Sequence, residues 1–229
     1  MTSGAAQPGP VPAGFPPAVQ HGLPGWTLLW ADLEPLPDGA GGEALAALRT
    51  AVERAALGTH TLEGLASHPT AAAVRKLFRR AGTDPTRYRP SSEALLRRVL
   101  KGDVLPPIHP LVDLNNCLSV QLVVPACVID VTAVAPPFVL RTGVPGETML
   151  SLRGPFDLHG KPLLADVHGP FGTPITDSER VKVSATSTRA WLVAYLPAGI
   201  VAPAVAAAAL AALLARAPVA RLHHVAVTA

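Results

Sequence analysis

The sequence has few cysteines and few aromatic residues, and each shortage narrows what the chain can be. Only two cysteines, Cys117 and Cys127, occur in 229 residues. Two thiols are too few for a disulfide framework, and both stand among apolar residues, which predicts buried, reduced side chains. Aromatic residues make up 4% of the chain, while hydrophobic residues of all kinds make up 49%. Leucine, valine and alanine must therefore build the core.

Several patterns typical of catalytic or cofactor sites are also missing. There is no phosphate-binding loop, no Rossmann glycine pattern and no Gly-x-Ser-x-Gly elbow. No cysteines or histidines have the spacing of zinc ligands. The sequence therefore predicts no cofactor, no metal and no serine nucleophile. The first residues lack a secretion signal, and the apolar stretch 203–216 is too short to span a bilayer, so we expect a cytoplasmic protein without a membrane partner.

The chain divides by composition into an extension and one domain. Residues 1–25 contain six prolines and several glycines. Such a segment buries too little apolar surface to offset its ordering entropy, so we expect a flexible extension. Residues 26–229 have the length and the apolar content of a single domain. No sequence feature fixes its oligomeric state, and a monomer is slightly favoured.

Apolar periodicity within 26–229 predicts a mixed α/β (α+β) fold with helices grouped on a sheet. We expect strands at 26–30, 163–166, 181–183, 190–196 and 221–227, and helices at 43–57, 70–81, 91–101, 110–123 and 203–216. Residues 138–142 and 149–152 are expected to pair as strands around the turn 143–146. Residues 169–179 are expected to form an irregular loop.

Positive charge gathers between residues 75 and 101. This segment has nine basic residues and two acids, which gives +7, whereas the whole chain carries +3 and the remainder therefore −4. A basic face of this kind fits a polyanion such as RNA, although a solvated helix surface would have the same pattern. The candidate RNA-binding residues are Arg75, Lys76, Arg79, Arg80, Arg87, Arg89, Arg97, Arg98 and Lys101.

A compact polar cluster follows on an apolar background. The run 112–116, Val-Asp-Leu-Asn-Asn, places an acid and two amides between apolar residues. Buried polar groups are costly unless each finds a partner. Asp113 can cap a helix while the asparagines satisfy turn amides, or an asparagine can line a pocket; the residues alone leave both interpretations open.

These two runs together carry a resemblance to a known family. Residues 87–102, RYRPSSEALLRRVLKG, followed by 111–116, LVDLNN, resemble the tRNA-editing domain of the bacterial phenylalanyl-tRNA synthetase beta subunit. That domain comprises the third and fourth modules of the subunit, and the chain is more similar to its free-standing versions. The resemblance extends from about Trp26 to the C-terminus and is strongest over 84–130. It implies a compact β-sandwich of unusual topology flanked by helices.

The resemblance also implies a chemistry and a set of site residues. In the synthetase domain a misattached amino acid on the tRNA 3′ end enters a pocket, where a positioned water hydrolyses the ester. The family pattern Val-Asp-x-Thr-Asn matches 112–116, which makes Asn116 a pocket residue and a catalytic candidate, with Asp113 and Asn115 beside it. Cys127 stands where the family has the pocket histidine. Asp166 matches an acidic strand end and is the second catalytic candidate.

The other pocket candidates come from the second half of the chain, and several of them have a structural interpretation as well. The family's glycine-rich loop is replaced here by 175–179, Ile-Thr-Asp-Ser-Glu, which includes Asp177. Arg141 and Glu147 flank the expected hairpin and can also simply pair with each other. Thr186 and Thr188 lie in a hydroxyl-rich run that can hold a water or a ribose, or cap a turn.

The resemblance, together with the basic segment, thus implies a tRNA-binding protein that acts as a trans-editing aminoacyl-tRNA deacylase. The partner would be the aminoacylated 3′ end of a tRNA. Two alternatives are a non-catalytic RNA-binding module with a decayed pocket and a small-molecule (amino-acid) binding protein whose basic face is merely solvated. The chain is too short for a complete synthetase and has no ATP-site motif.

Overall fold

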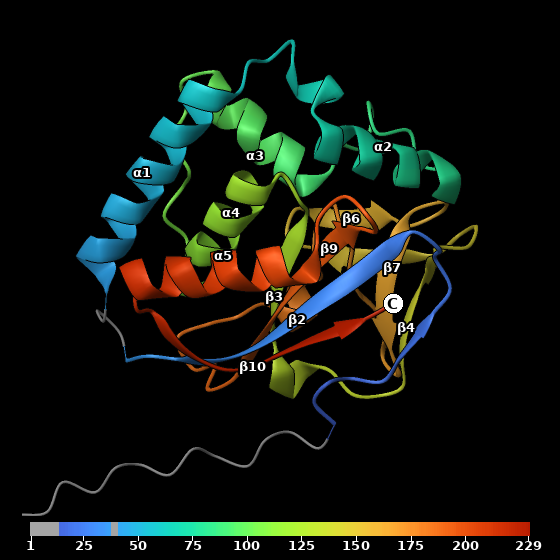
Figure 1. Cartoon of the computed structure of the whole chain (residues 1–229). Helices are drawn as coiled ribbons and strands as arrows, with labels where there is room; N and C mark the ends of the chain where they lie inside the picture. The colour runs from blue at the N-terminus through green and yellow to red at the C-terminus, as the bar shows by residue number, and fades with distance from the viewer. Residues whose placement is uncertain (1–13, 38–40) are drawn as a thin grey trace, which may run out of the picture.

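Two four-stranded sheets and a layer of helices stack in three layers (Figure 1). The computed structural model describes residues 14–37 and 41–229. The central sheet has the strand order β10-β2-β9-β3 and the second sheet the order β1-β4-β7-β8, while β5 and β6 form a separate ribbon. This arrangement confirms the predicted mixed α+β fold with a sandwich of sheets flanked by helices.

The elements follow the chain in a simple order. The strands are β1 (Val19–His21), β2 (Trp26–Pro35), β3 (Ala126–Asp130), β4 (Phe138–Thr142), β5 (Thr148–Ser151), β6 (Gly154–Asp157), β7 (Pro162–Asp166), β8 (Gly169–Gly172), β9 (Ala190–Pro197) and β10 (Ala220–Thr228). The helices are α1 (Gly42–Thr59), α2 (Pro69–Ala81), α3 (Ser91–Leu100), α4 (Pro110–Leu122) and α5 (Pro203–Arg216). All five predicted helices are confirmed.

The central sheet is buried on both faces. Alternate residues of a strand point to opposite sides, so β2 contributes Leu29 and Ala31 to the core beneath the helices and Leu28 and Trp30 to the core between the sheets. Both neighbours of β2 run antiparallel to it. A strand buried on both faces reads as a continuous apolar run, which is the pattern of 26–33.

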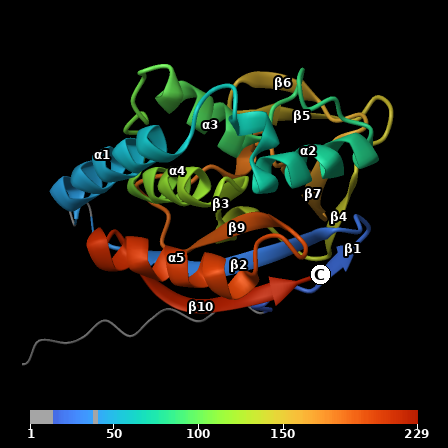
Figure 2. The same cartoon turned by 45° about the horizontal axis from the view of Figure 1, so that its top comes forward.

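Four helices, α1, α3, α4 and α5, close the core on the outer face of the central sheet (Figure 2). Nine of the thirteen residues of α4 are buried, so this helix lies at the centre of the layer. The second helix, α2, instead packs Val74, Leu77 and Phe78 into the core between the sheets, next to Trp26. No helix in the described part of the chain is long and apolar enough to cross a membrane.

The predicted pairing of 138–142 with 149–152 is wrong. Strand β4 pairs with β7 and, in parallel, with β1, while β5 pairs with β6. The cause lies at Gly143, whose N–H donates to the carbonyl of Lys161 at 2.9 Å. A Cβ on Gly143 would lie 2.0 Å from the carbonyl oxygen of Leu158. The chain therefore crosses onto the 158–161 turn at this point instead of turning back on itself.

Two local predictions in the second half are also corrected. The expected loop 169–179 contains β8, which pairs with β7, and the expected strand 181–183 is absent. Instead a 3₁₀ turn covers Glu179–Val181, and the hydroxyl of Ser178 accepts the N–H of Arg180. Val181 and Val183 are both buried. The two valines alternate with an exposed lysine because each contacts the core separately. This alternation is what predicted a strand here.

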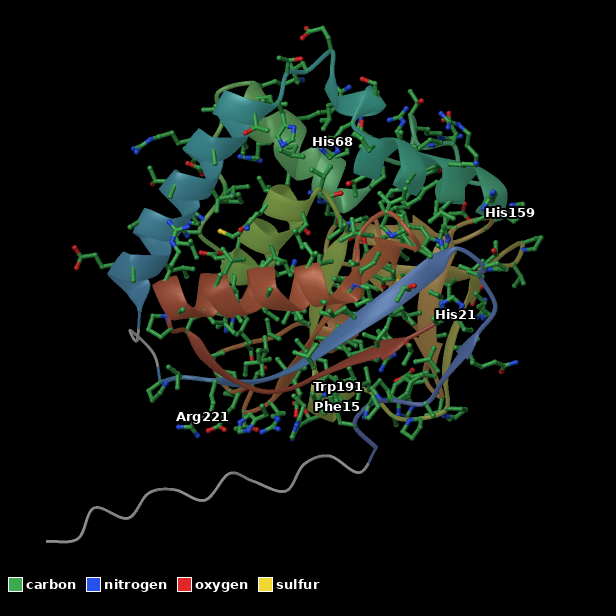
Figure 3. All side chains as sticks on the ribbon, viewed as in Figure 1. Phe15, His21, His68, His159, Trp191 and Arg221 are labelled. Carbon is green, nitrogen blue, oxygen red and sulfur yellow. The ribbon has the colours of Figure 1, made fainter. Side chains whose placement is uncertain are left out.

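The N-terminal segment is only partly within the described residues. The flexible extension was expected over 1–25, and residues 1–13 lie outside what the structure describes. From there on the chain packs on the sandwich: β1 runs parallel to β4, and the ring of Phe15 lies 6.0 Å from that of Trp191 (Figure 3). Phe15 and β1 therefore pack on the domain ahead of the boundary that was expected at residue 26.

One buried ion pair joins the central strands. Asp32 of β2 is fully buried, and Arg189, just before β9, donates to both of its carboxylate oxygens at 2.6 and 2.5 Å. The carboxylate of Asp32 raises the pKa of the Arg189 guanidinium. Such a pair contributes little net stability, but removal of one partner leaves a buried charge without compensation.

We therefore expect Arg189→Met to lower the free energy of unfolding by about 3–5 kcal/mol. The matched control is Arg221→Met, because Arg221 is exposed and forms an ion pair with Glu34 at the longer distance of 3.5 Å. Exposed pairs are worth at most about 1 kcal/mol. Urea unfolding of both variants at neutral pH measures the difference, and equal losses would contradict the role given to the Asp32 pair.

Candidate functional site

The candidate site lies where the N-terminus of α3 meets two other segments. The N–H of Ser91 donates to the carbonyl of Pro174 at 2.9 Å, in the 173–177 loop that follows β8. The hydroxyl of the next residue, Ser92, donates to the carbonyl of Val123 at 3.3 Å, in the connection between α4 and β3. The start of α3 therefore holds the 173–177 loop near the connection that leads from α4 into β3, the strand that carries Cys127.

Three polar side chains converge between the sheets at this point, and we call them the Cys127 cluster: Cys127, Asp177 and Tyr195. The thiol of Cys127 lies 4.0 Å from the hydroxyl of Tyr195. Gly172 on β8 faces all three groups. A Cβ added there would lie 3.4 Å from the Tyr195 hydroxyl, 3.5 Å from Oδ1 of Asp177 and 3.8 Å from the Cys127 sulfur. An alanine at 172 would therefore touch all three groups at ordinary van der Waals distances.

Burial governs the protonation of the Cys127 cluster. Removal from water raises the pKa of the Cys127 thiol and that of the Tyr195 phenol well above their ordinary values. It also raises the pKa of the Asp177 carboxyl to about 8. Oδ1 of Asp177 is buried and has no hydrogen-bond partner among the described residues. The cluster therefore holds a neutral acid, a neutral thiol and a neutral phenol at pH 7.

The three candidates on α4 lie on the helix side of the central sheet. Asp113 is buried, forms an ion pair with Arg49 of α1 and accepts the N–H of Ile108 at 2.9 Å. Asn115 donates to the carbonyl of Ala126 at 3.2 Å, while its own Oδ1 is buried without a partner among the residues described. Asn116 is 9% exposed, and its amide forms no hydrogen bond within the described part of the chain.

The predicted residues thus fall on both sides of β3. Asn115 reaches Ala126, which faces the core beneath the helices, while the neighbouring residue Cys127 faces the core between the sheets. Among the predicted pocket residues, the structure brings together Cys127 and Asp177. Asn115 approaches the same strand from its other face.

The remaining acidic candidates are engaged elsewhere. Both carboxylate oxygens of Asp166 accept from Arg180, at 2.8 and 3.1 Å, and each also accepts a backbone N–H. Arg141 donates to both oxygens of Glu147 at 2.8 and 2.6 Å, which is the simple pairing considered from the sequence. That contact lowers the pKa of the Glu147 carboxyl.

The hydroxyl-rich candidates form an exposed turn. The hydroxyls of Thr186 and Ser184 lie 2.9 Å apart, and Ser187 donates to Asp130 at 2.5 Å. Thr186 and Thr188 are both exposed. The run therefore forms a capped turn, which was one of its two interpretations from the sequence. Neither threonine contacts the Cys127 cluster.

Sequence reasoning missed Tyr195 and Gly172. Tyr195 lies within an apolar strand, where a lone tyrosine is read as core, and its hydroxyl becomes notable only beside an acid. Gly172 lies in the segment that was expected to be a loop. The sequence contained one signal, because Asp177 follows the strand-like run 169–172 by a few residues. Only the pairing of β7 with β8, however, places Asp177 next to β3.

Seven of the nine predicted RNA-binding residues are exposed and form no ion pair with any described residue. We call these seven the basic surface: Lys76, Arg79, Arg80, Arg87, Arg89, Arg98 and Lys101. The other two, Arg75 and Arg97, bind the buried carboxylate of Glu93 at 2.8 and 3.2 Å. The basic surface spreads over α2, α3 and the segment between them, on the side of the molecule opposite β10 (Figures 1 and 2).

Comparison with known proteins gives one match to a family. The model of a family described as the B3/4 domain matches residues 73–209. The chain belongs to this family. The match confirms the resemblance on 84–130, because that stretch lies inside it, and it includes both the B3/4 domain's basic surface and its Cys127 cluster.

Solved structures add a remote neighbour of this B3/4 domain. A crystal structure of an N-terminal fragment of the phenylalanyl-tRNA synthetase beta subunit from Pyrococcus horikoshii is similar to the chain, with a TM-score of 0.43 and 14% sequence identity. The similarity covers 85% of this chain and 46% of that one. The B3/4 domain chain therefore spans less than half of that fragment. No curated protein matches it.

The raised pKa of Asp177 predicts a pH dependence of stability. Its carboxyl binds a proton in the folded chain up to about pH 8, whereas in the unfolded chain it loses that proton near pH 4. Stability is therefore fully present below about pH 4 and falls as the pH rises to about 8, by up to about 1.4 kcal/mol per pH unit.

Asp177→Asn removes this titration and keeps the shape of the side chain. We measure the free energy of unfolding in urea between pH 5 and pH 8. As the pH rises, we expect the value for the natural protein to fall relative to the value for the variant. Asp84→Asn serves as the control, because Asp84 is exposed. Parallel pH profiles for Asp177→Asn and the natural protein would refute a neutral, buried Asp177.

Proposed function

We propose that this B3/4 domain binds aminoacylated tRNA and hydrolyses a mischarged aminoacyl ester where the N-terminus of α3 meets the end of α4 and the 173–177 loop. The observation that carries the proposal is the continuity between the basic surface and this junction. Arg87 and Arg89 immediately precede α3, and the first residue of α3, Ser91, holds the loop that carries Asp177. A phosphate backbone bound by the two arginines would bring the 3′ end of the tRNA to this loop.

The charge distribution supports a polyanionic partner. A glutamate already compensates two arginines of the segment, and the seven cations of the basic surface face solvent without a described acid to pair with. Uncompensated charge of one sign costs stability through self-repulsion unless a partner neutralises it. Phosphate groups, spaced along a nucleic acid, are such a partner.

The proposed chemistry is attack by water on the ester carbonyl. The raised pKa of the Cys127 thiol keeps it protonated and makes it a poor nucleophile. Water forms the new C–O bond, and the ribose hydroxyl of the tRNA leaves with a proton. The amide of Asn116 is our candidate for orienting the water or the carbonyl, since a preorganised hydrogen-bond donor stabilises the developing oxyanion.

A specific observation favours a second candidate function, binding of tRNA without hydrolysis. Asp166 was a catalytic candidate, and Arg180 together with two backbone amides occupies its carboxylate. An acid held in this way cannot also accept a proton from an attacking water without losing an ion pair. In this second function the basic surface binds the tRNA and the cluster only stabilises the fold.

Deacylation of a panel of mischarged tRNAs separates the two functions. We expect selective hydrolysis of at least one pair, and a loss of about 100-fold in rate for Asn116→Ala. The control is Gln121→Ala, which removes an exposed amide from the same helix. Hydrolysis of no pair, with tRNA binding intact, would refute the deacylase and leave the binding function.

Binding of tRNA as a function of salt tests the basic surface. Removing one cation that binds a phosphate should flatten the slope of log K against log[salt] by about 0.7–0.9. Arg87→Gln combined with Arg89→Gln should therefore weaken binding and flatten this slope by about 1.5. The exposed Arg54 of α1 provides the control, Arg54→Gln. Affinity that does not depend on salt, or that both variants lower equally, would count against this surface.

A further inference from the structure

Lys161, in the turn that leads into β7, is a buried lysine. Only 2% of its surface is exposed, although lysine is almost never fully buried unless its charge is paired. Its acidic neighbour is Asp157, which lies 3.2 Å from Nζ and is itself largely exposed, and the carbonyl of His159 lies 3.4 Å away. One exposed carboxylate is a weak partner for a buried charge, so this ammonium needs further compensation.

Two aromatic rings supply it. The Nζ of Lys161 lies over the ring of Tyr88, 4.0 Å from its centroid, and 5.4 Å from the centroid of the Phe156 ring. The two rings are nearly perpendicular, at 88° and 6.1 Å between centroids. A cation within about 6 Å of a ring centroid is attracted by the electrons of the ring face, and the attraction is stronger where water is excluded. The surroundings of Lys161 therefore depend on Tyr88, which lies between α2 and α3.

The turn 158–161, which carries Lys161, also contacts the end of α2. The hydroxyl of Thr83, just after this helix, donates to the carbonyl of Gly160 at 2.6 Å. Figure 3 shows His159, in the same turn, beside the end of α2. A backbone hydrogen bond from the residue after β4 holds the other side of the turn. The ammonium of Lys161 is therefore presented to Tyr88 from a fixed support.

Tyr88 stands between two arginines of the basic surface. Arg87 and Arg89 are exposed, and the guanidinium carbon of Arg87 lies 5.2 Å from the centroid of the Tyr88 ring. The segment 84–90 belongs to no helix or strand, and the N–H of Tyr88 donates to the carbonyl of Asp84 at 2.9 Å. The path of so short an irregular segment depends on its side-chain contacts. The contact of the Tyr88 ring with Lys161 is one that ties it to the second half of the chain.

We propose that Lys161 is a positioning residue for the basic surface: its ammonium holds the ring of Tyr88 and thereby fixes the direction in which Arg87 and Arg89 face a phosphate backbone. Lys161 is buried, so it does not itself face the tRNA. The inference rests on the proposed function, which assigns the two arginines to the tRNA. Cations held in place lose less conformational entropy on binding than mobile ones, so the contact would raise the affinity without adding an RNA contact.

Limited trypsin cleavage tests the contact without any RNA. Trypsin can cut after Arg87 once the segment opens, and it does not cut after Arg89, because a proline follows. Lys161→Met removes the charge and keeps an unbranched side chain. We expect this variant to be cut after Arg87 about tenfold faster, since cleavage follows the population of the open state. The matched control is Lys182→Met, which removes an exposed lysine, and the exposed Arg54 of α1 gives a reference cleavage site within each protein.

Binding of tRNA at a fixed salt concentration tests the consequence. We expect Lys161→Met to bind at least about threefold more weakly, because a smaller fraction of the molecules holds the arginines in place. Lys182→Met has lost the same charge and should bind almost as the natural protein does.

Variants of Tyr88 test whether the ring is the partner of Lys161. Tyr88→Phe keeps the ring and should bind normally, because the hydroxyl of Tyr88 forms no hydrogen bond with any described residue. Tyr88→Leu removes the ring and should bind as weakly as Lys161→Met. The double variant should bind no more weakly than either single one, because both changes remove the same contact. Urea unfolding establishes that each variant is folded.

Four outcomes would overturn the proposal. Cleavage after Arg87 could be unchanged in Lys161→Met, or it could rise only together with cleavage after Arg54, which would indicate a general loosening of the fold. Binding of tRNA could be as strong in Lys161→Met as in the natural protein, or Lys182→Met could weaken it equally, so that net charge alone would explain the loss. If the natural protein binds no tRNA while Lys161→Met is still cut faster after Arg87, the proposed function fails and the hold of Lys161 on the segment stands.

Discussion

Burial of the central sheet on both faces is the constraint on which the rest of the structure depends. Because helices cover one face and a second sheet covers the other, each buried apolar residue from Trp26 to Leu33 in β2, from Ala126 to Ile129 in β3 and from Ala190 to Leu196 in β9 belongs to one of two cores. A polar residue there must find a partner, as Asp32 does in Arg189. The same alternation puts Ala126 under α4 and Cys127 between the sheets, and so divides the predicted pocket.

Electrostatics divides the basic segment in a similar way. The nine cations cannot be told apart in the sequence. In the structure the buried carboxylate of Glu93 on α3 forms ion pairs with two of them, Arg75 of α2 and Arg97 of α3. A buried carboxylate needs charged partners, whereas an exposed arginine is stable in water alone. The seven that remain form no ion pair with any described residue, and they are the ones that the proposed function assigns to the tRNA.

The fold was predictable from sequence where the pattern was local. The helices 70–81 and 91–101 have an apolar stripe, a start signal and a stop signal, and α2 and α3 end within a residue of those positions. Pairing between distant strands was not predictable in this way: the crossing of Gly143 over Leu158 depends on a contact that no periodicity encodes. Cys127 and Asp177 were found through resemblance to a family, while Tyr195 required the register of β9 with β3.

Asp166 and Asp177 show why the site could not be predicted from the sequence alone. The sequence gives no reason to prefer Asp177 over Asp166, and the family resemblance favours Asp166. In the structure four hydrogen bonds fill the acceptor positions of Asp166, whereas Oδ1 of Asp177 is buried with none from any described residue. An acid with filled acceptor positions stabilises a turn, and an acid with an empty one can take a new donor. A substrate amine or a held water is such a donor, so under the proposed function Asp177, and not Asp166, is the acid that we assign to this contact.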